Sequence, residues 1–203
     1  MGCGGAAESG GSLFASYRLA ERVPEREIPM SSDVMNAINL MKSQHRTMRL
    51  RFVELRAAKT FEHKRRIFED LADVLAVHVA IGDRQFYPAV RARKHGEQLL
   101  AKFSGHLNIK RVLSDLLQID TDRESFTVKL RLLREVVEHH MRQEENEVFP
   151  QVKRLLGEVQ LAILGREMGM EAERIESAGS PRLRVNADIA RAPLGCMARD
   201  EVP

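Results

Sequence analysis

Two eleven-residue stretches, HVAIGDRQFYP at 78–88 and HMRQEENEVFP at 140–150, each run from a histidine to a proline. The stretches begin 62 positions apart (140 − 78). Each follows an earlier histidine at a matched distance, because His45 lies 33 residues before the first stretch and His106 lies 34 residues before the second. The chain therefore contains an internal repeat, which predicts two similar helical hairpins with one histidine on each helix.

Apolar residues recur at spacings of three and four on either side of these histidines, which is typical of amphipathic helices. The composition agrees with an all-α protein, because 43% of the residues are hydrophobic, only 5% are aromatic and tryptophan is absent. Four long helices with short connections predict an antiparallel up-down-up-down four-helix bundle with a short C-terminal helix. The expected helices cover about 33–55, 61–90, 97–117, 123–156 and, for the short one, 158–176.

The domain boundaries are predicted from the loss of this periodicity near both ends of the chain. Residues 1–31 combine a Gly/Ala/Ser opening with two prolines, which favours a disordered N-terminal arm. Residues 32–176 form the expected bundle domain. Residues 177–203 contain three further prolines and are expected to form a disordered tail.

Charge and cysteine usage narrow the possible partners and the compartment. The net charge of +3 is a small difference between 32 basic and 29 acidic side chains, so we expect no nucleic-acid partner. No apolar run is long enough for a membrane span, so we expect no membrane association. Cys3 and Cys196 lie in the terminal segments, which predicts free thiols and a cytoplasmic protein. The sequence does not indicate a protein partner.

The four repeated histidines on apolar helix faces predict a metal site. A buried polar group without a partner costs about 1–3 kcal/mol, so four imidazoles at one level require a shared partner. Glu144 lies four residues after His140 and therefore on the same helix face, about 40° away. Imidazole and carboxylate groups inside a helical bundle suit non-haem iron. Glu145 is rotated about 140° from His140 and is expected to be an exposed charge.

Through these residues the chain resembles the hemerythrin-like HHE cation-binding family, from about 35 to 156. The resemblance rests on the two long stretches, on Gln44-His45 and on HLNIK at 106–110. It implies a four-helix bundle that holds a non-haem, commonly di-iron centre. Such proteins are implied to carry or sense dioxygen, to sense iron, or to respond to nitric oxide and oxidative stress. The ligands implied by the resemblance are His45, His78, His106, His140 and Glu144.

Two positions depart from the family pattern. Gly82 stands where the second helix should carry a glutamate four residues after its histidine, so one carboxylate is missing. A π-bulge, which a glycine permits, would turn Asp83 inward, so Asp83 is a sixth candidate ligand. We also expect that a glutamate introduced at Gly82 would supply the missing carboxylate. His106 has Lys102 and Lys110 four residues away instead of a second histidine, so the five-histidine oxygen-carrier site is not expected.

The remaining histidines and the methionines on these helices have simpler explanations. His139 points about 100° away from His140 and is expected to lie outside the site. His63 and His95 lie near helix ends and are expected at the surface. Met41 and Met48 follow helical spacing and are expected to fill the core.

The leading functional hypothesis is an iron-binding module, with mono- or dinuclear iron, that senses a small molecule or takes part in a stress response. The sensed species would be dioxygen, nitric oxide or iron itself. One alternative is an enzyme that processes peroxide or nitric oxide at an open iron position. The other is a structural bundle with a degenerate metal site, for which Gly82 is the evidence.

Overall fold

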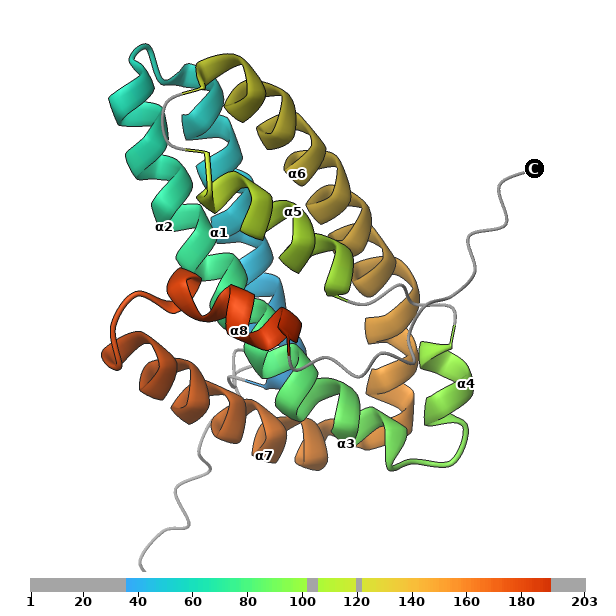
Figure 1. Ribbon diagram of the computed structural model, residues 1–203. Helices are drawn as coiled ribbons and strands as arrows, with labels where there is room; N and C mark the ends of the chain where they lie inside the picture. The colour runs from blue at the N-terminus through green and yellow to red at the C-terminus, as the bar shows by residue number, and fades with distance from the viewer. Residues whose placement is uncertain (1–35, 102–105, 120–121, 191–203) are drawn as a thin grey trace, which may run out of the picture. The chain divides into compact units, whose positions relative to one another are not determined.

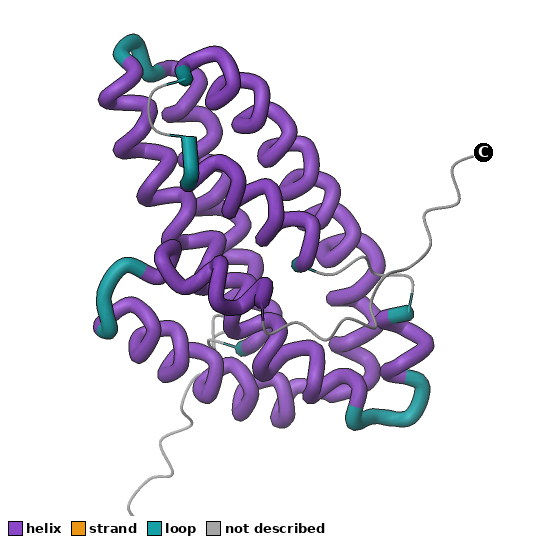
Figure 2. The backbone as a smooth tube through the Cα atoms, viewed as in Figure 1, coloured by secondary structure: helices purple, strands orange, loops and turns teal. Residues whose placement is uncertain are grey.

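A computed structural model of the chain describes residues 36–101, 106–119 and 122–190. Within these ranges every regular element is a helix, as Figures 1 and 2 show, so the all-α prediction is confirmed. The predicted N-terminal arm lies outside the described residues. No helix in the described part of the chain is both long and apolar enough to cross a membrane.

The first two helices form a hairpin. α1 (Ala37–Ala57) begins after Asn36, whose side-chain oxygen accepts the backbone N–H of Asn39 at 2.9 Å. α2 (Phe61–Ile81) begins after Thr60, whose hydroxyl oxygen caps its first turn in the same way. Only a short link separates the two helices, and they pack along each other in Figure 1.

Each long stretch of the repeat contains a π-helical turn between two α-helical segments. α2 continues into η1 (Gly82–Phe86) and then α3 (Tyr87–Arg91). In the second half, α6 (Arg123–Gln143) continues into η2 (Glu144–Val148) and then α7 (Phe149–Ser177). The proline that ends each stretch lacks a backbone N–H, and the wider turn before it accommodates the missing helical bond. The π-bulge expected at Gly82 is confirmed, and the repeat has a second one.

The third predicted helix is divided into two. α4 (Gly96–Leu100) and α5 (Leu107–Leu117) replace the continuous helix expected over 97–117. His106 therefore stands at the start of α5, in a turn, and not within a helix.

Gly157 divides α7 into two arms. Its backbone has φ 73° and ψ 169°, a left-handed conformation that favours glycine because a side chain would be strained there. The predicted helix end at Gly157 and the predicted short helix over 158–176 correspond to this kink and to the second arm.

The buried side chains form two apolar clusters with the histidines between them. On α1, Met41 belongs to one cluster and Met48 to the other, and His45 lies between them. On α6 and η2, His140 separates Val137 from Val148 in the same way. The core prediction for the two methionines is confirmed, since both are at most 1% exposed. The histidine layer is therefore enclosed by apolar packing on both sides.

The chain after α7 returns to pack on α2 and α5 (Figure 1). It forms η3 (Pro181–Arg184) and α8 (Val185–Ala190), where the sequence predicted a disordered tail from 177. The backbone N–H of Arg182 donates to Asp73 at 2.9 Å, and its guanidinium donates to both Asp73 and Glu69. The charged contacts of Arg182 and the burial of Val185 explain why this segment is helical and not disordered as predicted. Residues 191–203 lie outside the described part of the chain.

Arg182→Ala is expected to lower the free energy of unfolding by about 1–3 kcal/mol, because two partly buried carboxylates lose a charged donor. Chemical denaturation followed by circular dichroism measures this change. Arg184→Ala is the matched control, since the exposed Arg184 donates to the backbone carbonyl of Ala178 and to no carboxylate among the described residues, and it should change the stability by less than about 0.5 kcal/mol. Equal effects of the two substitutions would contradict the assigned role of Arg182.

Candidate metal centre

Three imidazoles and one carboxylate meet in the buried layer. His78, His106, His140 and Glu144 each offer a ligand atom, and these atoms lie within 4.8 Å of one another. The Nε2 atom of His140 is 3.3 Å from that of His78 and 3.2 Å from that of His106. All four residues are at most 5% exposed. The donor atoms therefore face one another and not the solvent.

Glu144 also joins His45 to this group. Its Oε2 atom lies 2.9 Å from Nε2 of His45, 3.3 Å from Nε2 of His140 and 3.6 Å from Nε2 of His78. Neither His45 Nε2 nor Glu144 Oε2 makes a properly oriented hydrogen bond with any described residue. The structure thus brings together five of the six predicted ligands, four as a tight group and His45 through the carboxylate.

Hydrogen bonds on the outer side of three rings fix the direction of their inner nitrogens. In each case Nδ1 lies within hydrogen-bond distance of a side-chain oxygen, which can only accept, so Nδ1 carries the proton. The inner Nε2 atom then presents an unprotonated lone pair, as metal-binding histidines do. The pairs are His45 with Glu145 at 2.8 Å, His78 with Gln44 at 3.1 Å and His106 with Asp83 at 2.8 Å.

Asp83 orients His106 from outside the group of ligand atoms. The predicted π-bulge turns its carboxylate towards Nδ1 of His106, and its other oxygen lies 2.6 Å from Nζ of Lys110. Burial alone would raise the pKa of Asp83, but His106 and Lys110 lower it to about 2. The structure therefore places the sixth predicted ligand on the opposite side of the ring from the inner nitrogens.

Glu145 has the same role in the other half of the repeat. It contacts Nδ1 of His45 at 2.8 Å and the guanidinium of Arg49 at 2.9 Å, and its side chain is only 25% exposed. The expectation of an exposed charge was wrong, because the second π-turn rotates this residue towards α1. The repeat contained the signal, since Glu145 and Asp83 are also 62 positions apart (145 − 83).

The ring of His106 lies in the space that a side chain at position 82 would need. A Cβ atom on Gly82 would be 2.5 Å from Cε1 of His106, closer than atoms can pack. A glutamate at Gly82 would therefore have to displace His106 before its carboxylate could reach the centre. The glycine allows His106 to reach the centre from the start of α5.

Tyr87 is a residue of the centre that the sequence analysis missed. Its hydroxyl donates a hydrogen bond to Oε1 of Glu144 at 2.6 Å and lies 3.4 Å from Nε2 of His106. Burial and the nearby Glu144 carboxylate raise the pKa of Tyr87 well above its usual value. The repeat pairs Tyr87 with Phe149, and this replacement of one aromatic residue by a hydroxylated one was the available signal.

The ionisation states suit a cation. Burial lowers the pKa of His78 and of His140, so both rings are neutral near neutral pH. Burial would raise the pKa of Glu144, but the imidazoles of His140 and His45 lower it well below its usual range. Neutral imidazoles and an ionised carboxylate that face one another fit a metal ion that accepts nitrogen and oxygen donors.

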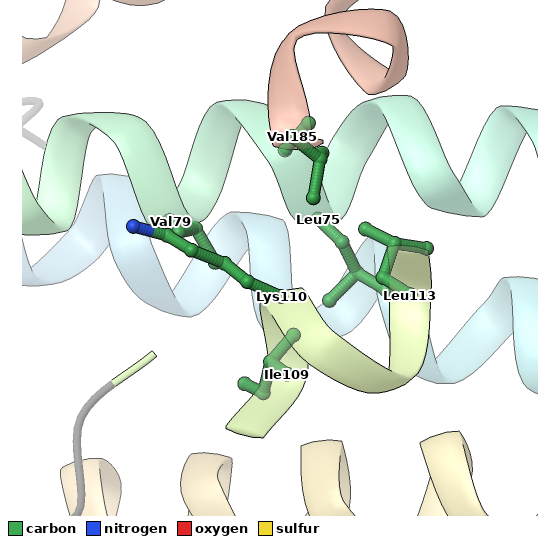
Figure 3. Close-up of a pocket in the computed structure, with 7 residues that line it drawn as sticks. Leu75, Val79, Ile109, Lys110, Leu113 and Val185 are labelled. Atoms are coloured by element: carbon green, nitrogen blue, oxygen red, sulfur yellow. The ribbon is translucent and has the colours of Figure 1, made fainter. Parts of the chain in front are cut away.

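The other histidines lie away from this centre, since His63, His95 and His139 are all exposed as predicted. A small pocket between α2, α5 and α8 is also separate from it (Figure 3). Its lining is apolar apart from Lys110, so it offers no set of metal ligands. The lining residues are Leu75, Ala76, Val79, Ile109, Lys110, Leu113 and Val185.

Gly82→Ala is expected to displace His106 and to weaken metal binding by at least about tenfold, with a loss of about 1–3 kcal/mol of stability from overpacking. Metal titration and thermal denaturation measure the two effects. Gly169→Ala is the control, because a Cβ atom there meets nothing within 4 Å and a helical alanine is favoured by about 0.5–1 kcal/mol. Unchanged metal affinity in Gly82→Ala would contradict the assigned packing.

The metal-free protein is expected to lose stability as the pH falls below 6.5. The folded-state pKa values of His78 and His140 lie below their ordinary value of 6.5, so the unfolded chain takes up protons that the folded chain does not. Each ring lowers the unfolding free energy by up to about 1.4 kcal/mol per pH unit. Denaturant unfolding between about pH 7.5 and pH 5.5 tests this. Constant stability over that range would show that the two rings are not buried as neutral imidazoles.

The comparisons with known proteins agree with this geometry. The hemerythrin HHE cation binding domain matches residues 36–152. A crystal structure of a hemerythrin HHE cation binding domain-containing protein from Mycobacterium kansasii superposes with a TM-score of 0.63 at 21% identity, over 74% of this chain and 98% of that one. This likeness supports the fold.

A sequence relative is a protein from Nostoc sp. named DNA nickase, which is 23% identical over 126 residues. The aligned part is 62% of this chain but only 36% of that protein, so the chain spans about a third of the relative's length. The family match, in contrast, covers more than half of this chain. The chain therefore belongs to the hemerythrin HHE cation-binding family.

Proposed function

We propose that the protein is a non-haem iron-binding bundle that acts as a small-molecule sensing or stress-response module. The observation that carries the proposal is the meeting of three inner imidazole nitrogens and the Glu144 carboxylate within 4.8 Å. Imidazole with carboxylate is a donor set that suits iron inside helical bundles. The four histidine-bearing segments are arranged, in this proposal, in up-down-up-down order around the ion.

The donor set favours one iron ion per chain. Among the described residues the tight group contains a single carboxylate, that of Glu144. The space at Gly82, where a second carboxylate would start, is filled by the ring of His106. His45 reaches Oε2 of Glu144 at 2.9 Å and adds a further donor on the side of α1. We therefore favour a mononuclear site held by His78, His106, His140 and Glu144 and completed by His45.

Metal binding would connect the elements that carry the ligands. His45 comes from α1, His78 from α2, His106 from the start of α5, and His140 and Glu144 from the junction of α6 and η2. Iron would supply the affinity for dioxygen or nitric oxide that side chains lack. The protein residues hold the rings in one tautomer, exclude water and keep Glu144 ionised. A ligand that binds only the folded state stabilises it. Iron bound at this centre would therefore change the stability of the bundle.

The alternative of a structural bundle with a degenerate metal site rested mainly on Gly82. Gly82 suggested a degenerate site, but His106 uses the space that the glycine leaves and brings an inner nitrogen to the centre. Four buried imidazoles, three of them held by outer hydrogen-bond partners, would cost more free energy than apolar side chains if they only filled a core. The cytoplasmic location and the absence of a nucleic-acid partner remain proposals based on the cysteines and on the balanced charge.

The purified protein is expected to bind about one ferrous ion per chain under nitrogen, and its melting temperature should rise with the iron concentration. Elemental analysis after gel filtration gives the stoichiometry, and differential scanning calorimetry gives the melting temperature. A protein that binds no iron, and whose melting temperature does not change with the iron concentration, would contradict the proposal.

His140→Ala and His139→Ala provide a matched pair, because the two residues are neighbours but only His140 is buried among the donor atoms. His140→Ala should reduce iron affinity by at least about a hundredfold, whereas His139→Ala should leave it unchanged. Equal losses would show that the ion binds elsewhere.

A further inference from the structure

The hydroxyl of Tyr87 occupies the side of the centre that lacks a carboxylate. Tyr87 is the first residue after the π-turn that begins at Gly82, and it is only 4% exposed. Its oxygen contacts Oε1 of Glu144 at 2.6 Å and Nε2 of His106 at 3.4 Å. Tyr87 therefore touches two of the four proposed ligands directly.

The 3.4 Å distance from the Tyr87 oxygen to Nε2 of His106 is close to the spacing of two atoms that share one metal ion. Metal bonds to nitrogen and oxygen of about 2.0–2.2 Å place two ligand atoms at right angles about 3 Å apart. The inner nitrogens of His78 and His106 lie 3.3 and 3.2 Å from that of His140, so they have this spacing as well. The oxygen of Tyr87 thus extends the same set of donor atoms.

The two halves of the repeat differ at this position. Phe149 is the counterpart of Tyr87, and its ring stacks on His45 with centroids 5.8 Å apart and an interplanar angle of 19°. Glu144 is the counterpart of Gly82. One half therefore combines a carboxylate with an inert ring, and the other combines a glycine with a phenol. Each half brings one side chain with an oxygen to the centre.

We propose that the Tyr87 oxygen is a ligand of ferric iron in this centre and takes the coordination position that Gly82 leaves without a carboxylate. This inference rests on the proposed iron binding. The phenol releases its proton to solvent when the ion binds, as metal ligands generally do, and no electron is transferred in that step. Tyr87 then binds through its oxygen, while Glu144 keeps its Oε2 atom among the imidazoles.

The test uses the full-length protein loaded with ferric citrate and freed of excess iron by gel filtration. A phenolate bound to ferric iron gives a visible charge-transfer band and resonance-enhanced phenolate vibrations in the Raman spectrum. The chain has two tyrosines, so Tyr17→Phe is the matched control for Tyr87→Phe. Wild type and Tyr17→Phe should show both signals, whereas Tyr87→Phe should lose them and bind ferric iron at least about tenfold more weakly.

The Raman measurement on the wild type decides the question even if Tyr87→Phe does not fold. Bound iron without phenolate signals in the wild type would overturn the role of Tyr87 and leave the proposed function standing. Signals that persist in folded Tyr87→Phe would also overturn it. A wild-type protein that binds neither ferrous nor ferric iron would overturn the proposed function, and this inference with it.

Discussion

The structure depends on the meeting of imidazole nitrogens and one carboxylate inside an apolar core. The Nε2 atom of His140 lies 3.3 Å from that of His78 and 3.2 Å from that of His106, and Oε2 of Glu144 lies 3.3 Å from it. Nε2 of His45 and Oε2 of Glu144 lie 2.9 Å apart without a properly oriented hydrogen bond, so their lone pairs repel, and burial removes the water that would separate them. Apolar clusters on both sides of the layer hold the rings there. A cation at the meeting point converts this repulsion into attraction.

The repeat explains both the symmetry of the centre and its asymmetry. On the outside, the two halves agree, because a carboxylate in each π-turn holds Nδ1 of one histidine and is itself paired with a basic residue. On the inside, they differ, because Glu144 is matched by a glycine and Phe149 by Tyr87. The glycine makes room for the ring of His106, which reaches the centre from the start of α5. The hydrogen bonds to Nδ1 therefore orient the rings in the same way in both halves, whereas the residues that face the centre differ between the halves.

Much of this arrangement could be predicted from periodicity and spacing. The helical class, the buried faces of His45, His78 and His140, and the break at Gly157 all follow from local patterns. The division of the third helix could not be predicted in the same way, because apolar spacing continues across it. The role of Glu145 was missed because ideal helical geometry places it outside, whereas the π-turn adds a residue and rotates it inward. Tyr87 was missed because a phenol next to a proline has no spacing that identifies it as part of a metal centre.

X-ray absorption at the iron edge of the iron-loaded protein tests the central claim most directly, because it reports the atoms around the metal. The account predicts a first shell of nitrogen and oxygen only, outer scattering typical of several imidazole rings, and no second iron, since the tight group contains three histidines and one carboxylate. A sulfur-containing shell, or a shell without imidazole scattering, would contradict the claim that the ion binds between His78, His106, His140 and Glu144.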